Sequence, residues 1–194
     1  MDNAVTDEEQ DRALLAHSGA GDRDAFGRLY RRYESRIYGY VRNIVGDASL
    51  TEDLVVETMT AVWHSARSFS GGSRVSTWIL GIARHKAVDA VRARARLPPL
   101  VPVTAAGEVE SSAAGPVEIV EGERLAALTQ RALALLSNEH REALRLAFYE
   151  ELPYEEIAAL VGIPANTVKS RVFHAKLALR RHLDQLARVE CGGA

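Results

Sequence analysis

Residues 151–183 read ELPYEEIAALVGIPANTVKSRVFHAKLALRRHL. This stretch has the pattern of a helix-turn-helix: a short helix begins near Tyr154, Gly162 supplies the turn, and Pro164 suits the first position of the next helix. In the second helix Val168 is expected to pack inward, against the apolar residues of the first. The side chains that remain are therefore available to solvent or to a ligand.

The second helix of this motif is basic. Residues 165–188 carry six Lys or Arg against a single acid, Asp184. In DNA-binding motifs of this kind the N-terminal part of the second helix meets base edges, and basic residues contact phosphate. A helical hairpin without a DNA role would show the same Ala, Gly and Val spacing, but the charge argues against it. The residues expected to contact duplex DNA are Thr167, Lys169, Ser170, Arg171, Phe173, His174 and Lys176.

Upstream, the apolar spacing over residues 22–96 predicts three further helices. The first is bounded by Asp22 as N-cap and by Gly46 as a C-terminal glycine. The second opens at Ser49 with the spacing of a capping box, and the third begins near Ser76. Residues 124–136 and 138–150 are also predicted to be helices, with Ser137 as the candidate N-cap of the second. No alternation of period two is long enough to indicate a sheet, so the chain is predicted to be all-helical.

The composition divides the chain into two small helical domains joined by a flexible linker. The linker has four of the six prolines, five Glu without a base and no aromatic residue, and it cannot bury enough area to offset its ordering entropy. The expected boundaries are an acidic N-terminal tail at 1–21, a helical domain at 22–96, the linker at 97–123, a second helical domain at 124–187 and a C-terminal tail at 188–194.

Composition also excludes several classes of protein. The 194 residues include 24 Lys plus Arg, 26 Asp plus Glu and one cysteine, Cys191. One cysteine forms no intrachain disulfide and no Cys-based zinc site. No apolar run approaches the roughly 18 residues that span a bilayer, and the acidic N-terminus is unlike a secretory signal. We expect a cytoplasmic protein that needs no cofactor or metal. We also expect that it is not an enzyme, because no metal triad, nucleophile elbow or phosphate loop is visible.

A second basic segment lies in the first domain. Residues 74–96 carry six Lys or Arg against Asp89, which suggests a surface that meets a polyanion. The preceding loop, SFSGGSRVS, has the composition of a loop that closes over an extruded base, and an ordinary flexible connection is equally consistent with it. Trp78 stacks an unpaired base in one interpretation, but its helical spacing is more typical of a core residue.

An acidic patch forms on the helix before that loop. Glu52, Asp53 and Glu57 stand away from the apolar stripe of their helix. Taken alone, such a patch is most often a solvated face.

Three of these segments, in this order and separated by the Pro-rich linker, resemble a known family. EDLVVETMTAVWHSA (52–66), TWILGIARHKAVDAVR (77–92) and YEEIAALVGIPANTVKSRVFHAK (154–176) are similar to bacterial sigma factors of the extracytoplasmic-function (ECF) group. These are specificity subunits of RNA polymerase that have only regions two and four. The resemblance covers about residues 22–96 and 124–187.

The resemblance implies a role for each patch. The acidic helix would dock on the clamp of the largest polymerase subunit through Glu52, Asp53, Val56 and Glu57. The loop 67–76 and the basic helix after it would melt and read the minus-ten element through Arg74, Arg84, His85, Lys86 and Arg92. The helix 165–176 would read the minus-thirty-five element as duplex. Val56 stands where the family often has Gln, and His85 and His174 stand where Asn and Arg are commoner.

The function expected from these observations is that of a transcription initiation factor without catalysis of its own. It would bring core RNA polymerase to promoters and assist strand opening. The protein itself would have no membrane contact, and an anti-sigma factor would hold it inactive. The alternative is an autonomous helix-turn-helix regulator, which would normally be dimeric and carry a ligand or dimerisation domain where 22–96 lies.

Overall fold

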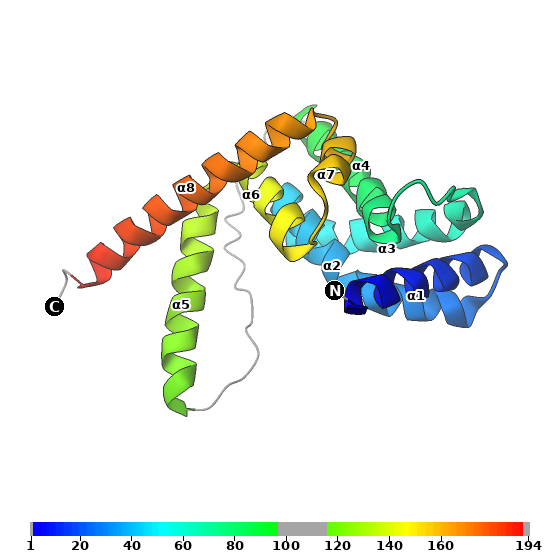
Figure 1. The fold of residues 1–194 in the computed structure, drawn as a ribbon, viewed down its shortest axis with the longest axis horizontal. Coiled ribbons are helices and arrows are strands. Elements are labelled where there is room, and N and C mark those ends of the chain that lie inside the picture. The colour runs from blue at the N-terminus through cyan, green and yellow to red at the C-terminus, as the bar shows by residue number, and fades with distance from the viewer. Residues whose placement is uncertain (1, 97–115, 192–194) are drawn as a thin grey trace. The chain divides into compact units, whose positions relative to one another are not determined.

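The computed structural model describes residues 2–96 and 116–191, and the side chains of residues 7–96 and 124–189. Within these ranges the secondary structure is entirely helical, as predicted from the sequence (Figure 1). The chain forms two compact units, Met1–Thr104 and Ala105–Ala194, which are described separately below. The expected linker falls largely outside the described residues, at 97–115.

The first unit opens with a helix, α1 (Asp2–Gly19), where the sequence predicted an acidic tail. That prediction was wrong, because α1 packs along α2 (Arg23–Val45). Among the side chains of α1 that the structure describes, from residue 7 onward, the buried ones are Asp11, Leu15 and Ser18, which follow a helical spacing and include one apolar residue. The acidic composition of this segment therefore gave no indication that one of its faces is buried.

Polar contacts secure α1 to α2. The Tyr33 hydroxyl donates to Asp11 Oδ2 at 2.5 Å, and both side chains are buried. Arg32 Nε lies 2.7 Å from Asp11 Oδ1, a close ion pair that is not aligned as a hydrogen bond, and Arg32 Nη2 lies 2.8 Å from Asp7 Oδ1. Burial raises the pKa of Asp11 above its ordinary value, against the opposing effects of Tyr33 and Arg32.

The ends of α2 confirm the predicted caps. The Asp22 carboxylate accepts hydrogen bonds from the backbone N–H groups of Asp24 and Ala25 at 2.9 and 3.0 Å, and these bonds lower its pKa. Gly46 ends the helix in the left-handed conformation, with φ 74°. Between these caps the helix supplies much of the core of the unit through Leu29, Tyr33, Ile37, Tyr40 and Val41.

The next helix, α3 (Ala48–Ser65), begins one residue before the predicted capping box. Its N-cap is Asp47 and not Ser49, because the Asp47 carboxylate accepts from the Leu50 N–H at 3.1 Å. A 3₁₀ turn (Ala66–Ser68) and a short loop lead to α4 (Val75–Arg96), one residue earlier than predicted. Both α3 and α4 pack on α2, so the two candidate surfaces of this unit are built on one core.

The second unit begins with α5 (Pro116–Ala134) and α6 (Asn138–Leu144). Residues 116–123 are therefore helical, where the sequence predicted the end of a linker; a proline at the first helical position followed by acidic residues favours such a start. Ser137 caps α6 as predicted, its hydroxyl accepting from the His140 N–H at 3.3 Å. The expected continuous helix 138–150 instead ends in a π-helical turn (Arg145–Tyr149).

Two helices complete this unit, α7 (Tyr154–Val161) and α8 (Ala165–Cys191). Because α8 continues to Cys191, the prediction of a C-terminal tail from residue 188 was wrong. Residues 192–194 lie outside the described part of the chain. α8 packs against α5, α6 and α7. The side chains at the centre of the core are Leu136, Leu146, Ile157, Val168 and Val172.

Candidate nucleic-acid interfaces

The turn between α7 and α8 has the geometry that the sequence predicted. Gly162 adopts φ 78° and ψ 36°, and its N–H donates to the Ala158 carbonyl at 2.9 Å. The Ile163 N–H donates to the same carbonyl at 3.1 Å. A Cβ at Gly162 would meet no atom within 4 Å, so the left-handed backbone, and not lack of space, favours glycine here.

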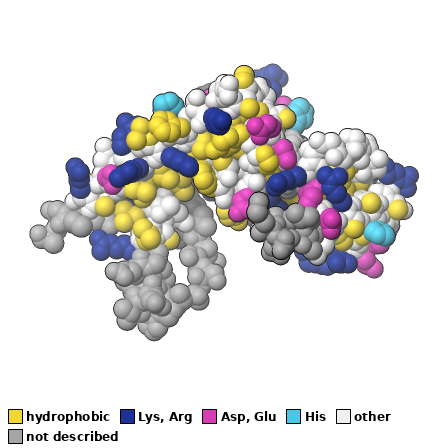
Figure 2. All heavy atoms as spheres, in the orientation of Figure 1, with side chains coloured by type: hydrophobic (Ala, Val, Ile, Leu, Met, Phe, Trp, Pro, Cys, Tyr) yellow, Lys and Arg dark blue, Asp and Glu magenta, His cyan; other side chains and the backbone are white. Residues whose placement is uncertain are grey.

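One face of α8 is buried and the opposite face is open. Val168, Val172 and Ala175 are buried against the rest of the unit. Of the expected DNA contacts, five are exposed and lie away from that face: Thr167, Lys169, Ser170, Phe173 and His174. Phe173 is 63% exposed although it is aromatic, and its ring lies 5.4 Å from that of His174. Lys and Arg side chains are spaced along α8 in Figure 2.

The other two expected contacts are engaged within the unit. Arg171 Nη2 lies 3.6 Å from Glu139 Oε2 of α6, and the arginine side chain is only 20% exposed. Lys176 is exposed, with Nζ 4.3 Å from the centre of the Phe148 ring. The structure therefore places Arg171 at the edge of the core, where it braces α8 against α6, and the outward surface centres on Lys169, Phe173 and His174.

The basic helix of the first unit, α4, carries basic side chains that already face acids. His85 Nε2 is 3.2 Å from Asp89 Oδ2, and Arg92 Nη1 is 3.8 Å from Asp89 Oδ1. Lys86 Nζ is 3.1 Å from Glu57 Oε2 of α3. This last pair joins a residue expected at the minus-ten element to one expected at the polymerase surface, so the two candidate surfaces of the unit are contiguous.

Another ion pair of α4 was not predicted from the sequence. Arg94 Nη1 lies 3.0 Å from Asp47 Oδ2, so the acid that caps α3 also holds the distal part of α4. The Leu50 N–H and then Arg94 lower the pKa of Asp47. The only sequence signal for this role was the position of Asp47 directly before a helix.

The loop before α4 is packed and not open. The Phe69 ring lies 5.3 Å from that of Trp78, and Trp78 is half-buried, so it packs against the loop and is not among the buried core residues. Arg74 is half-buried as well. Contacts from Glu8 and Arg12 of α1 reach this loop, and sequence reasoning missed both residues because it treated their segment as a tail.

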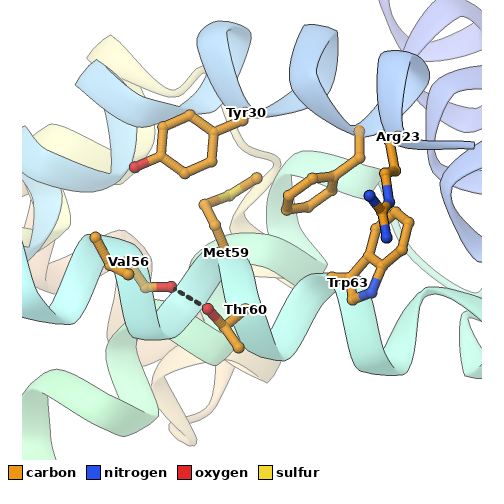
Figure 3. Close-up of a pocket in the computed structure, with 7 residues that line it drawn as sticks. Arg23, Tyr30, Val56, Met59, Thr60 and Trp63 are labelled. Carbon is orange, nitrogen blue, oxygen red and sulfur yellow. Dashed lines mark hydrogen bonds between the residues drawn. The ribbon is translucent and has the colours of Figure 1, made fainter.

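The acidic residues of α3 share an exposed face. Glu52, Asp53 and Glu57 are all exposed, and Val56 is 56% exposed among them. Beside Val56 an apolar groove with a volume of about 400 Å³ runs between α2 and α3. Figure 3 shows Tyr30 of α2 across from Val56 and Met59 of α3, with Trp63 further along the groove beside Arg23. The groove is lined by Arg23, Phe26, Tyr30, Val56, Met59, Thr60 and Trp63.

These features define a class: an all-helical, two-unit protein with a helix-turn-helix in one unit and a basic helix beside an acidic face in the other. Comparison with known proteins agrees unit by unit. Residues 29–97 match the model of Sigma-70 region 2, and residues 127–179 match that of Sigma-70, region 4.

Curated relatives and solved structures extend this match. The chain is 32% identical over 192 residues to the RNA polymerase sigma-H factor of Pseudomonas aeruginosa, covering 93% of this chain and 97% of that protein. It is 30% identical to the ECF RNA polymerase sigma-E factor of Salmonella typhimurium, covering 95% and 100%.

Two solved structures share the fold at 24% identity. CnrH, in complex with the cytosolic domain of CnrY, has a TM-score of 0.63 and covers 91% of this chain and 98% of its own. RpoE of Bartonella quintana, in complex with the anti-sigma factor NepR, has a TM-score of 0.65 and covers 82% and 96%.

The chain belongs to the ECF family of RNA polymerase sigma factors. It directs RNA polymerase to promoters, and core RNA polymerase and promoter DNA are its partners. Sigma factors are in general non-catalytic, DNA-binding initiation factors. An autonomous helix-turn-helix regulator, the alternative considered from the sequence, is excluded. Of the helices described, none is long and apolar enough to cross a membrane.

Proposed function

We propose that α8 reads the minus-thirty-five element as duplex, while the loop 67–76 and α4 capture the minus-ten element as it melts. The observation that carries the proposal is the division of α8 into a buried face, with Val168 and Val172, and an exposed face, with Lys169 and Phe173. A helix held in this way presents the same side chains to every promoter. Arg171 acts in this proposal as a brace, with its guanidinium available to a phosphate at the rim.

A substitution on the exposed face tests this assignment. Lys169→Ala should weaken holoenzyme binding to a promoter duplex about five-fold and lower the slope of log affinity against log salt by about one, as expected for the loss of one phosphate contact. Arg181→Ala, a change of the same charge further along α8, is the matched control and should leave both quantities nearly unchanged. Equal losses for the two variants would contradict the proposal, because a general charge effect would then account for both.

We also propose that the exposed acidic face of α3 docks on the clamp of the largest polymerase subunit. Asp53 stands at its centre and belongs to no buried stripe, so it is available to a basic partner. Val56, which is 56% exposed, offers that partner an apolar contact. The groove beside it extends the same surface toward Tyr30 and Trp63.

The remaining parts of the proposal concern regulation. CnrH and RpoE were solved with CnrY and with the anti-sigma factor NepR, and these complexes support an anti-sigma partner for this chain. We assign it no catalysis of its own and a cytoplasmic location, where core polymerase and promoter DNA meet. A pull-down from cells should recover core polymerase and one small additional protein.

A further inference from the structure

Helix α1 precedes the part of the chain that matches Sigma-70 region 2, which begins at residue 29. It nevertheless contacts the loop between Phe69 and Val75 at several points. Near the start of that loop, the Arg67 guanidinium donates to the Gly19 carbonyl at the end of α1. The loop proposed to capture an unpaired base is therefore built against α1 as well as against its own helix.

Glu8 holds the end of the loop. Both oxygens of its carboxylate accept from the backbone N–H of Val75, at 3.2 and 3.3 Å. Val75 is the first residue of α4, and the first N–H groups of a helix have no partner within the helix. A carboxylate at this position satisfies one of them and is favoured by the helix dipole. Glu8 thus provides from another helix what an N-cap normally provides from the preceding residue.

Arg12 holds the middle of the loop. Its Nε pairs with Glu8 Oε1 at 2.8 Å, and its Nη2 donates to the Ser73 carbonyl at 3.0 Å. The guanidinium carbon lies 5.7 Å from the centre of the Phe69 ring. Gly71 has φ 76°, and a Cβ there would lie only 3.1 Å from Arg12 Nη1. The arginine therefore binds the loop at Ser73 and lies close to it at Phe69 and Gly71.

We propose that Glu8 and Arg12 are positioning residues for promoter opening: they hold the loop 69–75 in the shape that takes up an unpaired base. The inference rests on the proposed function of that loop. A loop of Ser and Gly residues has many conformations, and a ligand that needs one of them binds in proportion to its population. Contacts from α1 raise that population before any DNA arrives.

The remaining anchors of α1 make this proposal testable. Leu15 is buried and Asp11 is held by Tyr33, so α1 stays on α2 when its contacts to the loop are removed. Asp7 provides a matched control. It neighbours Glu8 and pairs with Arg32 of α2 at 2.8 Å, so Asp7→Ala removes the same charge and one ion pair of α1 without touching the loop.

The experiment measures binding of holoenzyme to a labelled single strand. The strand carries the non-template minus-ten sequence of a promoter selected from random duplexes by the wild-type holoenzyme, and a second set of strands is abasic at one position each. On the intact strand, Glu8→Ala and Arg12→Ala should each bind about five-fold more weakly than wild type, the usual effect of losing a helix cap. The affinity of Asp7→Ala should stay within about two-fold of wild type. Glu8→Gln, which keeps an acceptor for the Val75 N–H, should have an affinity between those of wild type and Glu8→Ala.

The abasic strands separate positioning from general destabilisation. On the strand that is abasic at the captured position, wild type should bind more weakly than on the intact strand. Glu8→Ala should bind that abasic strand as well as wild type does. Wild-type sensitivity to one abasic position, combined with an unchanged five-fold loss for Glu8→Ala on that strand, would overturn the inference. Unchanged affinity of Glu8→Ala on the intact strand would do the same. Wild-type affinity that no abasic position alters would instead overturn the function proposed for the loop, and the inference with it.

Discussion

The hydrogen bond between Tyr33 and Asp11 allows the stability of the first unit to be predicted from its contacts. Tyr33→Phe removes only the hydroxyl, which donates to Asp11 Oδ2 at 2.5 Å inside the unit. Hydrogen bonds to a charged group contribute about 1.5–3 kcal/mol, and the carboxylate left behind is only 4% exposed, so water does not replace the donor. We expect the free energy of unfolding to fall by about 2 kcal/mol, which lowers Tm by roughly 8–16 °C for a unit of this size.

Fluorescence reports on this unit alone. The chain has two tryptophans, Trp63 and Trp78, and both lie in the first unit, so urea unfolding followed at their emission is not mixed with unfolding of the second. Tyr38→Phe is the matched control, because it removes the same hydroxyl from a half-buried side chain of the same helix. A loss for Tyr33→Phe no larger than that for Tyr38→Phe would refute the reasoning.

The pH dependence of the same site gives an independent measurement. Burial raises the folded-state pKa of Asp11 above the ordinary 3.8, so its contribution to stability is complete below 3.8 and is lost as the pH rises through the raised value. In Asp11→Asn the amide oxygen still accepts from Tyr33 but does not titrate. The stability of wild type relative to Asp11→Asn should therefore decrease from about pH 4 to pH 7, and a difference that grows over this range would show that the ion pair with Arg32 outweighs burial.

Two further outcomes follow from single positions. Gly162→Ala should lower the free energy of unfolding of the second unit by about 1–2 kcal/mol in a urea titration followed by circular dichroism, because φ is 78° and no atom obstructs the new methyl group; no loss would mean that the turn tolerates an ordinary residue. Asp53→Ala combined with Glu57→Ala should weaken binding to core polymerase several-fold at unchanged helicity, whereas Glu34→Ala, an exposed acid on α2, should not; equal affinity of all variants would remove the docking role of that face.

Local chemistry explains which parts of the fold were predictable. Asp22, Gly46, Ser137 and Gly162 were identified correctly because a cap or a left-handed turn depends on the residue itself and its immediate neighbours. Asp47 was missed in favour of Ser49 because both residues, two positions apart, are of types that are favoured at an N-cap. Such errors displace the start of a helix by one or two residues without changing the architecture.

The errors with larger consequences depend on distant residues. The buried face of α1 includes Asp11 and Ser18, and an acid predicts burial only when its partners are known. Those partners, Arg32 and Tyr33, lie 21 and 22 residues further along the chain. The apolar pattern alone therefore could not distinguish a packed helix from a solvated tail.

The candidate sites show the same limit. The exposed side chains of α8 were predicted from the helical period, because that period fixes which positions turn away from Val168. The pairing of Arg171 with Glu139 was not, since it depends on where α6 packs. Periodicity identifies the face of a helix, and the neighbouring helices decide which of its charges are engaged.

The pairing of cations on α4 has a consequence for how strongly ionic strength controls promoter opening. Lys86, Arg92 and Arg94 each lie within 3.8 Å of a carboxylate. When a phosphate displaces that carboxylate, the acid is left to attract a cation from solution, and this uptake offsets part of the counterion release that drives DNA binding. Binding of the melted strand should thus depend on salt less steeply than the number of Lys and Arg side chains on α4 suggests. Random DNA, which offers only phosphates, should gain correspondingly little affinity from this helix.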